Sequence, residues 1–199
     1  MNRRSEADHY TLRAKKEGYP ARSVYKLEEI DRKQPIVAKG ARVLDVGAAP
    51  GSWSLWLSRR VGSAGVVVAV DLSELSLRDR PSNLIEVTGD IYEEPTQAMI
   101  MEHAPFDAVV SDAAPATTGS RTVDTSRSAA LVEFLLYMLP SWLRSGGSFA
   151  AKLFQGGDEQ RLLSAVRETF GKAKTIKPKA CRKDSFETYL IGVDYDPKL

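Results

Sequence analysis

Residues 43–53 read Val-Leu-Asp-Val-Gly-Ala-Ala-Pro-Gly-Ser-Trp, a buried strand that passes through a turn of small residues into a helix. Glycine in such a turn permits positive φ and lets the backbone approach a ligand closely. In parallel sheets, turns of this kind lie at the carboxyl edge of the strands, where ligands bind. The stretch therefore predicts an α/β fold with a nucleotide-like ligand at this turn.

The same alternation of strand and helix continues along the chain. Short apolar runs predict strands at residues 42–46, 66–70, 84–88, 108–111, 148–153 and 189–193, and a weaker one at 174–176. Helical spacing predicts helices at 22–32, 52–60 and 124–143, and another that carries Leu162, Leu163, Val166 and Phe170 and is capped by Asp158. We expect a Rossmann-like fold, a mostly parallel seven-stranded sheet with helices on both faces.

Length and composition favour one domain over residues 1–199. A chain of 199 residues with 43% hydrophobic content can bury one sizeable core. The formal net charge is only +2, so the positions of the basic residues matter more than their sum. They gather in residues 1–35, which we expect to form a basic appendage, and again from Lys172 to Lys183.

The residue content also disfavours several classes of protein. The lone Cys181 cannot form an intramolecular disulfide, and neither His9 nor His103 has a partner at metal-ligand spacing, so no metal site is predicted. The amino terminus lacks the apolar core of a signal peptide, and no apolar run reaches transmembrane length. We expect a cytoplasmic protein without membrane attachment.

The turn after the first strand differs from the dinucleotide fingerprint. Ala49 replaces a glycine of that motif, and Pro50 stands where a helix terminus would receive pyrophosphate. A cofactor without phosphate tolerates both residues. Trp53 is a further candidate, whose ring either contacts the cofactor or packs on the sheet. We expect four turn residues to contact the cofactor: Gly47, Ala48, Pro50 and Gly51.

Two acids follow the next strands and support a cofactor site over a merely tight turn. Asp71 ends the second predicted strand, where a carboxylate can accept both hydroxyls of a ribose. Asp90 follows the third strand and is placed to accept from an adenine amino group. Because the carboxyl ends of parallel strands share one edge, we expect both acids beside the turn.

A second pair of charged residues lies deeper in the apolar pattern. Asp112 closes the fourth predicted strand, and Lys152 lies within a strand that otherwise reads Phe-Ala-Ala-Leu-Phe. A buried lysine is costly unless it is paired or has a function. The two residues therefore form either a structural ion pair or part of a working site.

These segments resemble the FtsJ/RrmJ family of ribose 2′-O-methyltransferases over almost the whole chain. Bacterial members usually have glycine where this chain has Ser52, a departure that would be harmless if the side chain pointed to solvent. The matching segments are Arg-Ser-Val-Tyr-Lys-Leu-Glu-Glu-Ile at 22–30, the turn at 45–53, Ser-Asp-Ala-Ala-Pro at 111–115, Ala-Lys-Leu-Phe-Gln-Gly at 151–156 and Ser-Phe-Glu-Thr-Tyr at 185–189.

The resemblance implies a class I methyltransferase that uses S-adenosyl-L-methionine, with Asp112 in both the cofactor site and the catalytic site. The closest bacterial members imply methylation of a uridine ribose in large-subunit (23S) ribosomal RNA on the assembled subunit, by a monomer that does not act on DNA. The family's catalytic tetrad falls on Lys26, Asp112, Lys152 and Glu187.

The chemistry is consistent with these roles. A ribose hydroxyl is a weak nucleophile that must be aligned with the methyl group and relieved of its proton. Lys152 is the candidate base, with Lys26 as the nearby cation that would promote its deprotonation. Alternatively, Lys152 steers the hydroxyl as a charged donor.

The basic segments are expected to contact RNA phosphates, although a charged run can also be only a solvated surface. Three competing functions remain open from the sequence. They are methylation of tRNA, ribosome assembly without catalysis, and nicotinamide-dependent oxidation, which the Ala-Ala-Pro turn disfavours.

Overall fold

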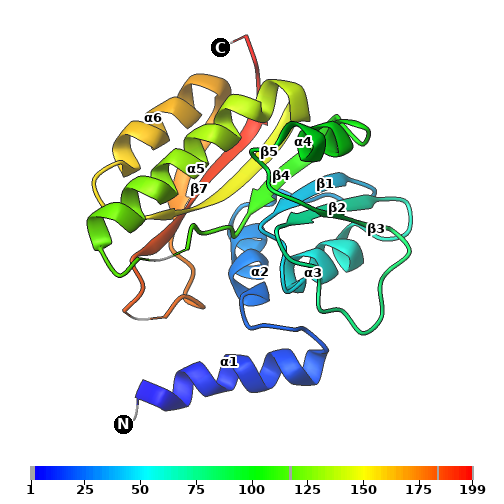
Figure 1. The fold of residues 1–199 in the computed structure, drawn as a ribbon, viewed down its shortest axis with the longest axis vertical. Coiled ribbons are helices and arrows are strands. Elements are labelled where there is room, and N and C mark those ends of the chain that lie inside the picture. Colours follow the sequence, from blue (N-terminus) through cyan, green and yellow to red (C-terminus); the bar gives the residue numbers. More distant parts are fainter. Residues whose placement is uncertain (1–2, 117, 183, 199) are drawn as a thin grey trace.

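Within residues 3–116, 118–182 and 184–198, which a computed structural model describes, the chain folds around a seven-stranded sheet (Figure 1). Side chains are described from residue 9 onward. The strand order is β3-β2-β1-β4-β5-β7-β6, and only β7 runs antiparallel to its neighbours. The strands are β1 Arg42–Val46, β2 Val66–Asp71, β3 Leu84–Thr88, β4 Phe106–Ser111, β5 Leu143–Phe154, β6 Phe170–Ile176 and β7 Glu187–Tyr195.

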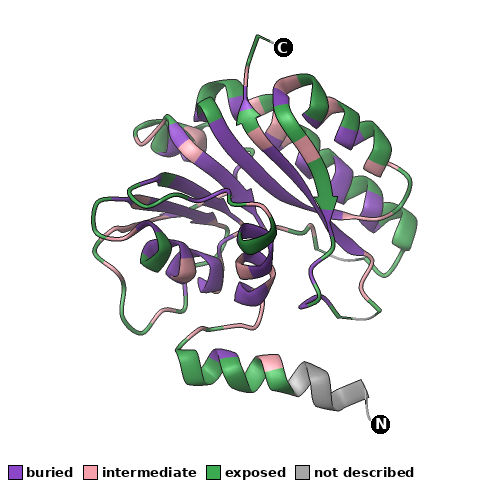
Figure 2. Cartoon of the chain, turned by 180° about the vertical axis from the view of Figure 1, so that it is seen from behind, coloured by how far each residue is buried: buried purple, intermediate pink, exposed green. Residues whose placement is uncertain are grey.

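Helices cover both faces of this sheet, so that its central strands are buried between them, whereas the edge strand β6 is mostly exposed (Figure 2). Helices α2 and α3 pack on one face, and α4, α5 and α6 pack on the other. The helices are α1 Arg3–Glu17, α2 Val24–Lys33, α3 Ser52–Val61, α4 Glu94–Met101, α5 Arg121–Trp142 and α6 Glu159–Thr169. The predicted fold class is confirmed.

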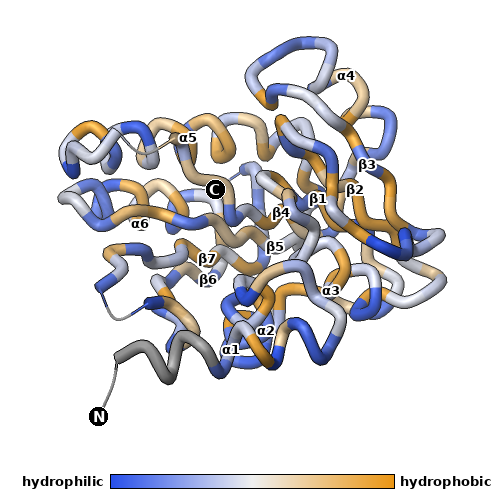
Figure 3. The backbone as a smooth tube through the Cα atoms, turned by 60° about the horizontal axis from the view of Figure 1, so that its bottom comes forward, coloured by the Kyte–Doolittle hydropathy of each residue, from blue (hydrophilic) through white to orange (hydrophobic). Residues whose placement is uncertain are grey.

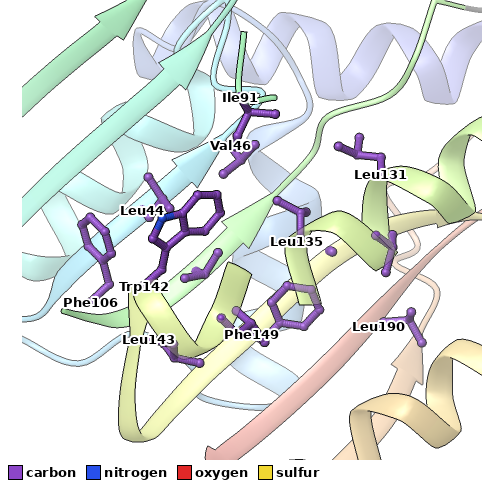
Figure 4. Packing of buried hydrophobic residues seen from close by; sticks show 14 of the residues in the cluster. Leu44, Val46, Ile91, Phe106, Leu131, Leu135, Trp142, Leu143, Phe149 and Leu190 are labelled. Carbon is purple, nitrogen blue, oxygen red and sulfur yellow. The ribbon is translucent and has the colours of Figure 1, made fainter. Parts of the chain in front are cut away.

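Successive strand residues enter opposite layers because side chains alternate across a sheet. Val43 packs with α2 and α3, whereas its neighbour Leu44 packs with α5. Figure 4 shows part of the second layer, in which Trp142 and Phe149 lie among the aliphatic side chains. Burial on both faces explains the continuous hydrophobic stretch of β2, which is visible in Figure 3.

The predicted amino-terminal appendage, residues 1–35, contains two different helices. Helix α2 belongs to the core, because Leu27 and Ile30 are fully buried against the sheet. Helix α1 instead lies outside the two helical layers (Figure 1). Residues 1 and 2, and the side chains of Arg3 and Arg4, lie outside what the structure describes.

Two local predictions were wrong, and a third was right only in position. Leu143 begins β5 and does not end the preceding helix. Phe170 begins β6, where its ring packs against those of Phe149 and Tyr195, so burial in the sheet overrides the helical spacing. Asp158 is the N-cap residue of α6, as predicted, but its carboxylate accepts from the Arg161 side chain and makes no capping hydrogen bond. Helices α1 and α4 were not predicted.

Candidate active site

A cavity of about 620 Å³ opens at the carboxyl edge of the sheet, a volume typical of small-molecule sites. Its lining comes from the ends of successive strands, with Gly47 after β1, Asp71 at the end of β2, Asp90 after β3 and Asp112 after β4. Lys152 of β5 completes this wall. The parallel strands thus bring together the acids that the sequence predicted at this edge.

The turn after β1 allows a ligand to approach because Gly47 has φ +75° and no side chain. A Cβ there would lie 2.5 Å from the Cα of Ala113, so any other residue would push the turn away from β4. Among the turn residues, Gly47 and Ala49 line the cavity. The predicted contacts Ala48, Pro50 and Gly51 are not among its lining residues.

Trp53 also lies away from the cavity lining. Its ring is buried beside that of Tyr189, with 5.9 Å between centroids, and its indole nitrogen donates to the Ser23 carbonyl oxygen at 2.9 Å. These contacts favour the packing interpretation. The adjacent Ser52 does not point to solvent, because it is buried and accepts a hydrogen bond from the Ala21 amide at 2.7 Å.

The half-buried carboxylates of Asp71 and Asp90 are oriented by backbone amides. Asp71 accepts from the amides of Ala49 and Ser73, both at 3.0 Å, and Asp90 accepts from the amide of Tyr92 at 3.0 Å. Each carboxylate retains lone pairs for a ligand's hydroxyl or amino groups. Pyrophosphate would face unfavourable charge here, whereas adenosine bearing a sulfonium fits this set of acceptors.

The structure brings the four predicted catalytic residues into one cluster of ion pairs. The Lys152 ammonium lies 3.1 Å from Asp112 Oδ1 and also donates to the Asp112 carbonyl oxygen. The Lys26 ammonium lies 3.0 Å from Glu187 Oε1 and 3.7 Å from Asp112 Oδ1. The four side chains are only 9–15% exposed, so their charges interact more strongly than at an open surface.

Tyr189 is a fifth member of this cluster, and the site prediction from sequence did not include it. Its hydroxyl donates to Asp112 Oδ1 at 2.6 Å, and it pairs with Lys152 across the antiparallel strands β5 and β7. Burial and the neighbouring carboxylate of Asp112 hold the pKa of Tyr189 well above its ordinary value. The hydroxyl therefore remains a proton donor that fixes Asp112 in position.

The electrostatics of Lys26 result from two opposing effects. Burial lowers the pKa of its ammonium, but the carboxylates of Asp112 and Glu187 outweigh burial and raise the pKa above its ordinary value. Burial also raises the pKa of the Cys181 thiol to about 12, with a contribution from its hydrogen bond to Glu187. The cluster therefore contains a charged Lys26 and a neutral thiol at pH 7.

Asp45 lies beneath the turn and is fully buried. Its Oδ2 accepts from the Ser54 hydroxyl at 2.6 Å, which ties β1 to α3. Burial raises the pKa of this carboxyl to about 7, and the charges of Asp112 and Asp71 add to the effect. The hydrogen bond between Asp45 and Ser54 therefore links the strand before the turn to the helix after it.

Two basic segments that are distant in sequence lie side by side next to α2. The Arg22 guanidinium donates to the Ala180 carbonyl oxygen at 2.8 Å, and the Lys179 amide donates to Glu29 at 2.7 Å. These bonds hold the β6–β7 loop against the helix that carries Lys26. The side chains of Lys177, Lys179 and Arg182 are exposed there, and Lys183 lies outside the described residues.

Among the residues that the structure describes, no group of three or more His, Cys, Asp or Glu side chains is arranged to hold a metal ion. No helix in the same part of the chain has both the length and the apolar character to cross a membrane.

This chain is similar to known proteins over most of its length. The model of the FtsJ-like methyltransferase family matches residues 19–195. Among curated proteins, ribosomal RNA large subunit methyltransferase E of Treponema denticola is 48% identical over 98% of each chain. The protein of the same name from Syntrophobacter fumaroxidans is 49% identical over 94% of each chain.

Two solved structures share the fold. A Plasmodium falciparum protein described as a ribosomal RNA methyltransferase has a TM-score of 0.77 and 24% identity, covering 89% of this chain and 98% of its own. Aeropyrum pernix fibrillarin, solved with bound S-adenosyl-L-methionine, has a TM-score of 0.60 and 17% identity, covering 86% of this chain and 76% of its own. At these identities the likeness concerns the fold alone.

Proposed function

Because this chain belongs to the FtsJ-like methyltransferase family, we propose that it transfers a methyl group from S-adenosyl-L-methionine to a ribose 2′-hydroxyl of large-subunit ribosomal RNA. The observation that carries the proposal is the cluster of Lys26, Asp112, Lys152 and Glu187, because Asp112 and Lys152 line the cavity that also holds Asp71 and Asp90 and that we call the acidic cavity. The resemblance stated from the sequence motifs is confirmed at the level of the family.

The cavity residues would hold the cofactor through its polar groups. Asp71 would accept from the ribose hydroxyls and Asp90 from the adenine amino group, since both carboxylates line the cavity and retain free lone pairs. The turn at Gly47 allows close backbone approach. When bound, the cofactor supplies a methyl group activated by its sulfonium centre.

The cluster would act on the RNA hydroxyl through Lys152. Two positions on its amine are directed to Asp112, one to the carboxylate and one to the backbone oxygen. The remaining position is available to the substrate, either as an N–H donor that aligns the hydroxyl or as a lone pair that accepts its proton. Asp112, Tyr189 and the Lys26–Glu187 pair keep this amine in place.

The RNA surface would combine α1 and α2 with the β6–β7 loop. Phosphate contacts supply much of the sequence-independent affinity for RNA. Exposed cations lie on α1, which precedes α2, and in the β6–β7 loop, which packs against α2. We also propose that the protein is a monomer and acts in the cytoplasm. Its substrate would be a uridine of the assembled large subunit.

Methylation mapping tests the proposal. The protein is incubated with labelled S-adenosyl-L-methionine and, separately, with large subunits, small subunits, free ribosomal RNA and tRNA, followed by nucleoside analysis. We expect label in 2′-O-methyluridine from large subunits and none with Lys152→Ala. Label in tRNA alone would overturn the substrate assignment. Cofactor binding without transfer to any of these RNAs would favour a non-catalytic assembly factor.

A further inference from the structure

A second cavity, of about 850 Å³, lies between α1, α3 and the β2–β3 loop. Its described lining includes four basic side chains and a single acid. The basic residues are Lys15, Arg59, Arg78 and Arg80, and the acid is Asp79. We propose that this basic groove binds backbone phosphates of the RNA outside the target nucleotide, an inference that rests on the proposed function.

Two of the cations are held in place by neighbours. The Arg59 guanidinium lies 4.8 Å from the ring centroid of Tyr19, a cation–π contact, and Arg80 forms an ion pair with Glu86 at 2.7 Å. Within the described residues, Lys15 and Arg78 form no ion pair, and both are exposed. Their charges are therefore available to an anion that enters the groove.

The basic groove and the acidic cavity lie on two sides of the turn that follows β1, which contains Gly47 and Pro50. The β2–β3 loop contributes Leu72 to the acidic cavity and Ser76 to the basic groove, where the Ser76 amide donates to the Pro50 carbonyl oxygen at 3.0 Å. The buried Ser52 hydroxyl joins the turn to the α1–α2 connection through Ala21. The groove is therefore fixed to the segment that holds the cofactor.

The first cavity is lined by three carboxylates (Asp71, Asp90 and Asp112) beside Arg127 and Lys152, whereas the basic groove has four cations and one acid. This difference in charge favours RNA as the occupant of the groove. Carboxylates of the acidic cavity suit a cofactor with a sulfonium, whereas the basic groove suits a polyanion. Helix α2, which follows the α1–α2 connection, carries Lys26 of the catalytic cluster. An RNA whose ribose lies at Lys152 and whose backbone follows α2 toward α1 would therefore meet the groove.

The test removes the two unpaired charges with Lys15→Gln and Arg78→Gln in one double variant. Loss of two phosphate contacts should reduce the slope of log K against log salt by about 1.4–1.8, at roughly 0.7–0.9 per contact. We expect KM for the RNA methylated by the parent to rise about tenfold at moderate salt. The kcat at saturating RNA and the Kd for S-adenosyl-L-methionine should not change, because neither residue contacts the catalytic cluster.

The matched control removes two charges elsewhere, with Lys39→Gln and Arg167→Gln. Both residues are exposed and, within the described part of the chain, form no ion pair; Lys39 precedes β1 at the opposite edge of the sheet and Arg167 lies on α6. An unchanged KM and salt slope in the groove variant, or equal losses in both variants, would overturn the groove proposal. Absence of methyl transfer by the parent would instead count against the proposed function, while filter binding of the same RNA would still test the groove.

Discussion

The acidic cavity and the proposed catalytic cluster share Asp112 but are built in different ways. Gly47, Asp71 and Asp90 follow successive parallel strands, so local sequence order is enough to place them at one edge. The cluster instead joins Lys26 of α2 to Glu187 of β7, which are 161 residues apart. It depends on how α2 packs beside the last strands.

This difference also concerns how the charges are satisfied. Each cavity carboxylate is oriented by nearby backbone amides and remains open to a ligand, whereas Asp112 is bound by two ammonium groups and a tyrosine hydroxyl. Substitutions of Asp71 and Asp90 should therefore weaken cofactor binding independently of each other. Substitutions in the cluster should be non-additive, because its members share partners.

The largest effect is expected for Lys152→Ala, which removes the only cluster amine that lines the acidic cavity in the described structure. Methyl transfer should fall by about 10³-fold or more, while cofactor affinity stays within about twofold. Single-turnover kinetics with saturating RNA measures this loss. Rates close to those of the parent would remove Lys152 from the mechanism.

Lys152→Arg distinguishes between the two possible roles of Lys152, a general base and a charged aligning group. Arginine keeps a positive charge but cannot lose its proton in a protein, so a general-base role predicts no activity. A charged aligning role predicts measurable residual turnover. Circular dichroism spectra that match the parent provide the control for folding.

The next largest effect is expected in the cavity, from Asp71→Ala and Asp90→Ala. Each removes a charged acceptor, and a hydrogen bond to such a group contributes about 1.5–3 kcal/mol, so the Kd for S-adenosyl-L-methionine should rise about 10- to 100-fold. Calorimetry measures the change. Asp71→Asn serves as a milder variant that can still accept from Ala49 or Ser73. Unchanged Kd values in folded variants would refute the assignment of these acids.

A smaller effect is expected for Tyr189→Phe, which deletes only the hydroxyl that binds Asp112. Loss of one hydrogen bond of about 1–1.5 kcal/mol should reduce kcat by roughly 5- to 10-fold, with KM for RNA unchanged. If the hydroxyl acts through Asp112 and Lys152, the substitution should cause little further loss in the Lys152→Ala background. Additive losses in the double variant would contradict this positioning role.

The smallest effect on methyl transfer is expected for Asp45→Asn, which should instead change how the free energy of unfolding depends on pH. The folded protein holds the Asp45 proton up to a pKa of about 7, whereas the unfolded chain releases it near pH 4. This contribution to stability is therefore complete below pH 4 and is lost as pH rises toward 7, with a slope of at most about 1.4 kcal/mol per pH unit. Urea unfolding of parent and variant between pH 4 and 8 measures the difference. If the free energies of unfolding of parent and variant changed with pH in parallel, the raised pKa of Asp45 would be contradicted.

Local sequence was sufficient for the elements whose pattern is short-ranged. The run at 43–53 determined the strand, the turn and the helix, and the positions of Asp71 and Asp90 after their strands placed them at the cavity. Lys26 and Glu187 could be assigned only through the resemblance of their motifs to a family, because no local periodicity relates α2 to β7.

Tertiary structure decided what depends on contacts between distant segments. The pairing of β5 with β7 places Tyr189 opposite Lys152, and the packing of α2 on α3 draws Trp53 away from the cavity. The basic groove likewise needs α1, α3 and the β2–β3 loop in one place. Hydrophobic periodicity records which face of a segment is buried, but the partner against which it is buried is determined by register and packing across the whole sheet.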